Sequence, residues 1–343
     1  MSSSSSAATT AGQEEGFLAK VGKFREIGLL AFIVVIMILT QLKNPNFFSG
    51  ENFDDLLANA SILGILALGM MLVIIIRGID LSIGATLALA GMIAALTVSH
   101  YQDLSPVLAL LLGTAVGLVC GALVGLAVAV FGVLPIIASL GMMYVFRGLT
   151  YIVSGRRWVS AYQMPDSFKD MAMLRDPVLG LRIYIYIAIV FYLIFYYFTN
   201  HTRTGRRIYA VGSNPESAAI SGIKATRLTW LTYVIMGGLS GFCGVLWVAK
   251  FASAQGDTAS GYEMNVIAAC VLGGVSIVGG SGKVSGVFLG TLLLGTLNNA
   301  LPMINMSVFW QNSIQGAIIL IAIIVNTLVK RNVDQANLRR RPI

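Results

Sequence analysis

Long runs of apolar residues constrain the fold of this chain more than any other feature of its sequence. Each run covers about 20 residues, the length that an α-helix needs to cross the hydrocarbon core of a bilayer. The composition agrees, because 57% of the residues are hydrophobic and 11% are charged, whereas a soluble domain is about a quarter charged. An outer-membrane barrel would instead show alternating segments of about ten residues. The sequence therefore predicts an all-α, polytopic helical membrane protein.

About ten transmembrane helices account for these runs. The first 16 residues lack the basic start and apolar core of a cleavable signal, and we interpret residues 1–25 as a disordered cytoplasmic tail. A basic tail, 331–343, follows the last run and leaves 26–330 as the membrane domain. The predicted spans are residues 26–43, 57–76, 81–99, 105–131, 134–154, 183–199, 228–250, 264–280, 284–301 and 308–329.

The basic residues predict the orientation of the spans, because Lys and Arg collect in cytoplasmic loops. With ten spans, the N-terminal flank, the loop 200–227 and the C-terminal tail fall on one side, so both termini are expected in the cytoplasm. The same rule explains the net charge of +8 without a nucleic-acid partner. A fourth basic loop, 155–182, falls on the opposite side. Either a re-entrant segment alters the count, or these basic residues face an external partner.

The glycine-rich stretch GGVSIVGGSGKVSG, residues 273–286, superficially resembles a phosphate-binding loop. The pattern G-x-x-x-x-G-K-[ST] requires a glycine where Ile277 stands and a hydroxyl where Val284 stands. We therefore expect no nucleotide here and interpret the glycines as sites of close helix packing, as in the fourth span. Glycines recur every four residues in two stripes: Gly113, Gly117, Gly121 and Gly125, and Gly282, Gly286 and Gly290.

The sequence offers no evident catalytic or metal-binding cluster. Cys120, Cys243 and Cys270 all lie in apolar runs, where they are expected to pack as small buried residues. The two histidines, His100 and His201, stand far apart at the ends of runs. A membrane-embedded enzyme is therefore disfavoured, as is a channel, because no filter-like motif is present.

Asp80 is the most informative charged residue near the spans. It lies in RGIDLSIG, residues 77–84, which interrupts the apolar pattern. A carboxylate within the bilayer commonly lines a pathway, whereas one at the surface can cap the next helix beside Ser82. Glu26 and Glu263 are the other acidic residues near span ends. An ion-coupled secondary transporter needs carboxylates inside its spans, so that class remains the less favoured alternative.

The basic loop GRRIYAVGSNPESAAISGIKATR, residues 205–227, predicts a short helix outside the membrane. Ser213 or Asn214 can cap its start, Pro215 suits the first helical position, and Glu216 favours the positive end of the dipole. Gly222 provides a stop. Because two turns of helix are unstable alone in water, the helix suggests a protein partner that packs on it. A solvated loop is the alternative.

Four motifs resemble those of one family, the integral membrane permeases of bacterial ABC importers for monosaccharides such as ribose, xylose, arabinose, galactose and rhamnose. They are GIDLSIG at 78–84, SLGMMYVFRG at 139–148, GRRIYAVGSNPESAAISGI at 205–223 and AACVLGGVSIVGGSGKVSGVFLG at 268–290. Together they are spread over about two thirds of the chain in the family's order. The last motif looks nearest to the branch that imports rhamnose or autoinducer-2.

The resemblance implies a division of labour in the bacterial inner membrane. The permease forms the path as a dimer, either of two copies or with a sister chain, and works by alternating access. Two ATPase subunits bind ATP and Mg²⁺ in the cytoplasm, so no cofactor and no catalytic site are expected in this chain. A soluble sugar-binding protein delivers the cargo from outside.

The resemblance also makes 213–222 a coupling helix that fits a groove on the ATPase. Small Ala218 and Ala219 would permit close docking, and Glu216 would cap the helix or pair with a basic residue. Ser213 stands where many relatives have a second glycine. The expected coupling positions are Gly212, Asn214, Pro215, Glu216, Ala218, Ala219 and Gly222.

Two further sets of residues are predicted contacts for the delivery protein and for the sugar. Acidic groups on the delivery protein would meet basic sockets on the outer loop, at Arg156, Arg157, Arg175 and Arg182. Polar groups in apolar spans must face protein or water, so they are candidates for the path. These are Asn59, Ser61, Asp80, Ser82, Thr86, Asn298 and Asn299, and each is equally suited to an interhelical hydrogen bond.

Overall fold

The computed structural model describes residues 26–177 and 180–307, together with 309–311, 313–318, 320, 321 and 324. Within these residues, eight helices are long and apolar enough to cross a membrane, which confirms the predicted fold class. They are Glu26–Lys43, α2 (Gly50–Ile75), α3 (Ile83–His100), α4 (Pro106–Ala129), α5 (Pro135–Val153), α7 (Ile183–His201), α10 (Ala225–Phe251) and α12 (Val284–Met303). The shorter helices are α6 (Asp166–Met173), α8 (Arg203–Ser213), α9 (Pro215–Ile220) and α11 (Tyr262–Leu272).

The long helices follow the predicted spans to within a few residues, except that α2 begins at Gly50. Its first turns are polar, so the apolar pattern concealed them. Ser49 caps this start by accepting a hydrogen bond from the Asn52 amide. The last predicted span, 308–329, lies largely outside the described residues, as do both predicted tails.

The eighth predicted span, 264–280, is wrong as a continuous helix. Helix α11 has 11 residues, so it is about 16 Å long, against about 30 Å for the hydrocarbon core of a bilayer. The stretch 273–283, called here the glycine loop, has no helical structure and joins α11 to α12 beside the end of α2, where the Gly280 amide meets the Ile75 carbonyl. Gly274, Gly279 and Gly280 adopt positive φ angles there, which side chains other than glycine rarely accept. Val275 of the loop is fully buried, whereas Ile277 and Val278 are exposed.

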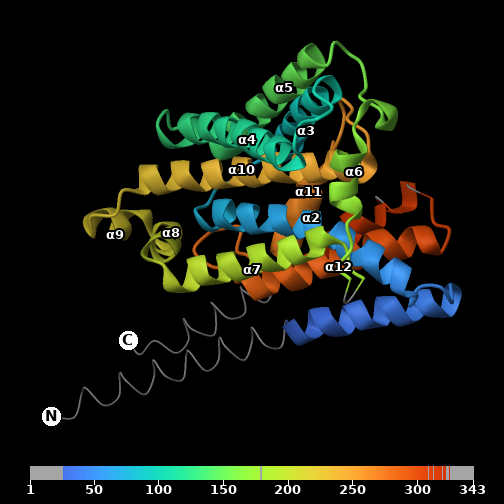
Figure 1. Cartoon of the computed structure of the whole chain (residues 1–343). Coiled ribbons are helices and arrows are strands. Elements are labelled where there is room, and N and C mark those ends of the chain that lie inside the picture. The colour runs from blue at the N-terminus through green and yellow to red at the C-terminus, as the bar shows by residue number, and fades with distance from the viewer. Residues whose placement is uncertain are drawn as a thin grey trace.

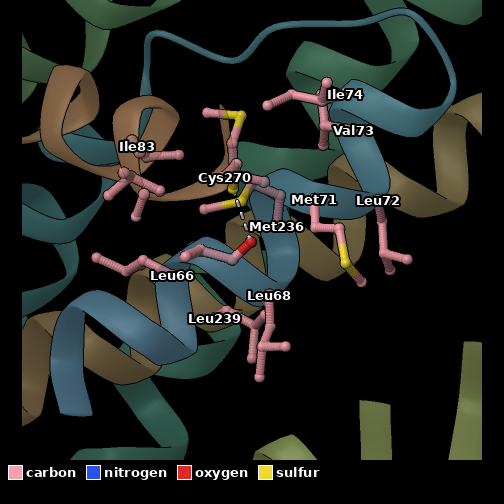
Figure 2. Packing of buried hydrophobic residues seen from close by; sticks show 14 of the residues in the cluster. Leu66, Leu68, Met71, Leu72, Val73, Ile74, Ile83, Met236, Leu239 and Cys270 are labelled. Atoms are coloured by element: carbon pink, nitrogen blue, oxygen red, sulfur yellow. Dashed lines mark hydrogen bonds between the residues drawn. The ribbon is translucent and has the colours of Figure 1, made fainter. Parts of the chain in front are cut away.

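Helix α2 is the centre of the bundle. It lies between α10 on one side and α7 and α12 on the other (Figure 1). In its most apolar stretch, 94% of the residues are buried. Figure 2 shows Leu66, Met71 and Leu72 of α2 in a cluster with Met236 of α10 and Cys270 of α11. The Cys270 thiol donates a hydrogen bond to the Ala67 carbonyl at 3.2 Å. All three cysteines are buried and free, as predicted.

The glycine stripe of the fourth span packs α4 against α10, as predicted. A Cβ at Gly117 would lie 2.2 Å from the carbonyl oxygen of Gly237, and one at Gly121 would lie 2.3 Å from that of Tyr233. In the second stripe, a Cβ at Gly286 would lie 2.0 Å from the carbonyl oxygen of Gly273. Glycine therefore lets the two backbones touch at each crossing.

The bundle has two chemically different ends (Figure 1). The α9 end carries α8, α9, the glycine loop and the start of the first helix, where Ser285 donates a hydrogen bond to Glu26 at 3.2 Å. The α6 end carries the segment 155–182 and the loop 252–261, which meet in a β-bridge between Val159 and Ala254. The loops 155–182 and 200–227 thus lie at opposite ends, as the predicted parity requires.

Candidate functional site

The predicted short helix outside the membrane is present as α9. Thr202 caps the preceding α8 by accepting a hydrogen bond from the Gly205 amide at 3.0 Å. Asn214, one of the two predicted caps, starts α9 by accepting from the Ser217 amide at 3.0 Å, and Pro215 occupies the first position. Gly222 follows the helix with a φ of 75°. The local sequence therefore encodes both the beginning and the end of this helix.

One face of α9 is free and the other is buried. Asn214, Glu216 and Ala219 are exposed, and the Ile220 residue is 90% exposed. Ala218, in contrast, is buried against this chain, so its small size serves the packing of α9 on the bundle. Sequence reasoning missed Ile220, although an isoleucine among polar residues next to a helix stop is an available signal.

Gly212 lies where α8 crosses the end of α2. A Cβ on Gly212 would lie 1.9 Å from the carbonyl oxygen of Ile75, so only glycine fits there. Arg77 donates hydrogen bonds from Nε to the Gly212 carbonyl at 2.7 Å and from Nη2 to the Ser213 carbonyl at 2.8 Å. These contacts fasten the α8–α9 hairpin to the end of the most buried helix.

The glycine loop is the third partner in this junction. The Gly280 amide donates a hydrogen bond to the Ile75 carbonyl at 2.8 Å. The Tyr209 hydroxyl of α8 donates to the Gly282 carbonyl at 2.9 Å, and burial raises the pKa of Tyr209 to about 12, which keeps this donor protonated. Helix α8, which leads into α9, therefore contacts both the end of α2 and the glycine loop.

Asp80 accepts hydrogen bonds at the start of α3, as one of its predicted alternatives has it, and it lines neither of the two cavities described below. It is buried, with 2% of its surface exposed. Its carboxylate also accepts hydrogen bonds from the Ser82 amide at 2.8 Å and the Ser82 hydroxyl at 2.6 Å, at the start of α3. Burial raises the pKa of the Asp80 carboxyl, and the two bonds from Ser82 oppose that rise. Thr86 lies one turn along, where its amide donates to the Ser82 carbonyl at 2.8 Å.

A cavity of about 180 Å³, called here the inner cavity, opens between α2, α10, α11 and α12. Two predicted path residues, Asn59 and Asn298, meet in it. Lys250 donates a hydrogen bond to Asn59 there. The lining residues are Asn59, Ile62, Leu63, Trp247, Lys250, Phe251, Tyr262, Gly295 and Asn298.

A second cavity of about 300 Å³, the outer cavity, lies towards the α6 end and shares Trp247 and Phe251 with the inner one. Arg147 supports its wall by donating hydrogen bonds to the carbonyls of Gly256 and Thr258 at 2.9 and 2.7 Å. The lining residues are Trp247, Phe251, Ser253, Gln255, Asp257, Thr258 and Ala259. The cavity therefore combines aromatic rings with a few hydroxyl and amide groups, the usual composition of a small-molecule site.

The other predicted path residues have partners within the bundle. Ser61 donates back to the Leu57 carbonyl at 2.7 Å. Asn299 and Asn52 join α12 to α2 through hydrogen bonds of 2.8 and 3.1 Å. Sequence reasoning missed Lys250 and Trp247. A cation at the end of an apolar run was the available signal for Lys250.

The predicted basic sockets fall into two groups. Arg182 forms ion pairs with Asp54 at 3.1 Å and Asp55 at 2.7 Å, and Arg175 reaches Asp54 at 3.1 Å. These two arginines therefore hold the outer segment on α2. Arg156 and Arg157 are exposed beyond the end of α5. Beside them lie Trp158 and Tyr162, which are exposed and were not predicted.

Comparison with known proteins agrees with this architecture. A family model described as "Branched-chain amino acid transport system / permease component" matches residues 52–323. The chain belongs to this permease family. The ribose import permease protein RbsC of Escherichia coli (strain K12) is 36% identical over 312 residues, which cover 90% of this permease and 96% of that protein. No solved structure matches the permease.

Two further relatives show the same pattern. The ribose import permease protein RbsC of Bacillus subtilis (strain 168) is 37% identical over 313 residues, covering 91% of this permease and 94% of that protein. The L-arabinose ABC transporter permease protein AraH of Azospirillum brasilense is 32% identical over 299 residues, covering 87% and 86%. The prediction of a sugar ABC-importer permease is confirmed, and these relatives give no support to the ion-coupled alternative. The finer placement near rhamnose or autoinducer-2 importers stays a prediction.

Proposed function

We propose that this permease carries a monosaccharide into the bacterial cytoplasm through the outer and inner cavities. The candidate cargoes are ribose, the sugar named for two of the relatives, and the predicted rhamnose, xylose and autoinducer-2. The Trp247 ring faces both cavities, so it can pass a sugar from one to the other. The permease itself supplies no catalytic group, and it lies in the inner membrane with both termini in the cytoplasm.

The observation that carries the proposal is the junction between α9, α2 and the glycine loop. An ATPase subunit with its own ATP and Mg²⁺ docks on the exposed face of α9. Because Gly212 and Arg77 lock α8 to the end of α2, a displacement of α9 reaches a helix that also lines the inner cavity. Rearrangement at the α9 end thereby biases the cavities between inward and outward access.

The coupling surface is tested with the permease reconstituted in lipid with its ATPase and its sugar-binding protein. Ile220→Glu places a charge in the proposed contact and is expected to weaken ATPase binding by roughly tenfold, as for an interface hot spot. Thr226→Glu is the matched control, because Thr226 is exposed at the same end but lies outside α9. Equal ATPase affinity for the two variants would refute docking on α9.

The same assembly identifies the cargo. ATP hydrolysis is measured with the binding protein loaded from a panel of ribose, arabinose, rhamnose, xylose and autoinducer-2. Stimulation by one sugar, accompanied by its uptake into the vesicles, names the substrate. Uptake that survives without ATP and collapses with an uncoupler would instead establish ion-coupled transport.

The binding protein docks at the α6 end on Arg156, Arg157, Trp158 and Tyr162. Exposed aromatic and arginine side chains are enriched in such contacts, and the charge speeds the encounter with an acidic partner. Arg156→Glu with Arg157→Glu is expected to raise the Kd of the binding protein most at low salt. An unchanged Kd would remove this surface from the proposal. The second permease subunit, either another copy or a sister chain, completes the assembly.

A further inference from the structure

Three arginines of α8 form a cationic cavity at the α9 end of the bundle. Arg203, Arg206 and Arg207 share one face of α8, because they stand three and four residues apart. With Ala210 and Ile223 they line a cavity of about 270 Å³. In the part of the chain that the structure describes, none of the three forms an ion pair with a carboxylate. The positive charge of the cavity is thus left for a ligand.

An apolar groove of about 350 Å³ lies between α7, α4 and α10. Phe198 lines it three residues before the end of α7, and Phe191 and Phe242 meet across it with ring centroids 5.3 Å apart. Its lining is apolar apart from Thr114. The groove is lined by Thr114, Leu118, Phe191, Ile194, Phe195, Phe198, Ile235, Gly238, Leu239 and Phe242.

The two sites lie on consecutive parts of the chain. Phe198 of the groove stands five residues before Arg203, and Ile223 of the cationic cavity stands two residues before α10, which supplies the groove from Ile235 onward. The groove runs from Phe198 back along α7 to Phe191, which is about 10 Å of helix. That distance covers much of one leaflet of a bilayer core about 30 Å thick.

We propose that this composite site binds one anionic phospholipid, with its phosphate on the three arginines and an acyl chain in the groove. Guanidinium groups bind phosphate oxygens bidentately, and basic pockets between transmembrane helices on the cytoplasmic side hold anionic headgroups. A soluble protein partner would explain the arginines but not an apolar groove between transmembrane helices. The bound lipid bridges α7–α8 to α10 and steadies the hairpin that carries α9.

Native mass spectrometry of the full permease tests the site with two probes, dioleoyl phosphatidylglycerol and dioleoyl phosphatidylcholine. The wild type is expected to retain phosphatidylglycerol preferentially. Arg203→Gln, Arg206→Gln and Arg207→Gln together are expected to lower that retention by about tenfold or more. The matched control is Arg156→Gln with Arg157→Gln, which removes charge at the α6 end and should leave retention unchanged. Melting in phosphatidylcholine confirms that each variant is folded.

Further arms separate the sources of the anion. Ile194→Trp fills the groove from an exposed position of α7 and should also lower retention. Free glycerol phosphate should compete only weakly, because it lacks the acyl chain. Full competition by glycerol phosphate, with no effect of Ile194→Trp, would reduce the site to an anion pocket and overturn the proposal. Unchanged lipid retention in the triple variant, with weaker ATPase binding, would assign the arginines to a protein contact instead.

Discussion

The two ends of the bundle are held together by different chemistry. At the α9 end, carbonyls of Ile75, Gly212 and Gly282 accept the hydrogen bonds that join α2, α8 and the glycine loop. At the α6 end, side-chain ion pairs from Arg175 and Arg182 to Asp54 hold the outer segment on α2, in addition to the backbone bridge between Val159 and Ala254. The closest contact at the α9 end is between two backbones, at Gly212 and Ile75, whereas ion pairs between side chains can reform in a new geometry. The α9 end therefore suits the proposed transmission of a displacement, and the ion pairs of the α6 end can adapt to one.

The largest expected effect comes from breaking the backbone contact at Gly212. Gly212→Val places a branched side chain against the Ile75 carbonyl, where even a Cβ would lie at 1.9 Å. We expect loss of transport to below a tenth of wild type, measured as sugar uptake in proteoliposomes. Gly50→Val is the control, because a Cβ at Gly50 would meet nothing within 4 Å. Transport by Gly212→Val at the wild-type rate would show that the junction does not couple the two segments.

The ion pairs at the α6 end are expected to matter for stability more than for coupling. Arg182→Ala leaves the buried Asp54 carboxylate with Arg175 and the backbone amide of residue 182, at a cost of about 3 kcal/mol in the free energy of unfolding. Thermal unfolding in detergent measures the loss, with Arg157→Ala as an exposed control. If ATP hydrolysis then became independent of the sugar while stability stayed the same, the distinction drawn between the two ends would be wrong.

Lys250 belongs to neither end of the bundle, because it lies between them in the inner cavity. A change there tests the proposed sugar path separately from the two ends. Lys250→Met keeps the length of the side chain and removes its hydrogen bond to Asn59. We expect a several-fold rise in the sugar concentration needed for half-maximal uptake, with little change in basal ATP hydrolysis, since the contact is polar and local. Met264→Ala, at an exposed position of α11, serves as a control. An unchanged concentration dependence would place the sugar elsewhere.

The smallest effect is expected at Asp80. Because burial raises the pKa of this carboxyl in the folded protein, folding favours its protonated form. Stability from this group is therefore present at acid pH and declines as the pH rises through the raised pKa. Asp80→Asn keeps an acceptor for both Ser82 donors and removes the charge, so it should flatten the dependence of melting temperature on pH above the ordinary range of a carboxyl. Parallel melting curves for the variant and the wild type would contradict this assignment.

The sequence was sufficient for features that depend on local patterns. The length of each apolar run was enough to predict the long spans. The cap at Asn214, the proline at 215 and the stop at Gly222 were enough to predict α9. The sequence was insufficient where tertiary contacts decide. The stretch 264–280 is apolar enough for a span, yet α11 ends at Leu272 because glycines with positive φ follow it. The sequence likewise did not reveal that Ala218 packs inward, or that Arg182 is paired with Asp55.

The broken eighth span has a consequence for how the protein is assembled in the membrane. An isolated segment with 11 helical residues and an irregular loop would expose backbone amides and carbonyls to lipid, which has no partners for them. The shelter comes from α2 and α12, through Gly280 against Ile75 and Gly273 against Gly286. The stretch 262–303 thus becomes complete only when it packs against α2, so the N-terminal half of the chain supplies part of the shelter that its C-terminal half needs.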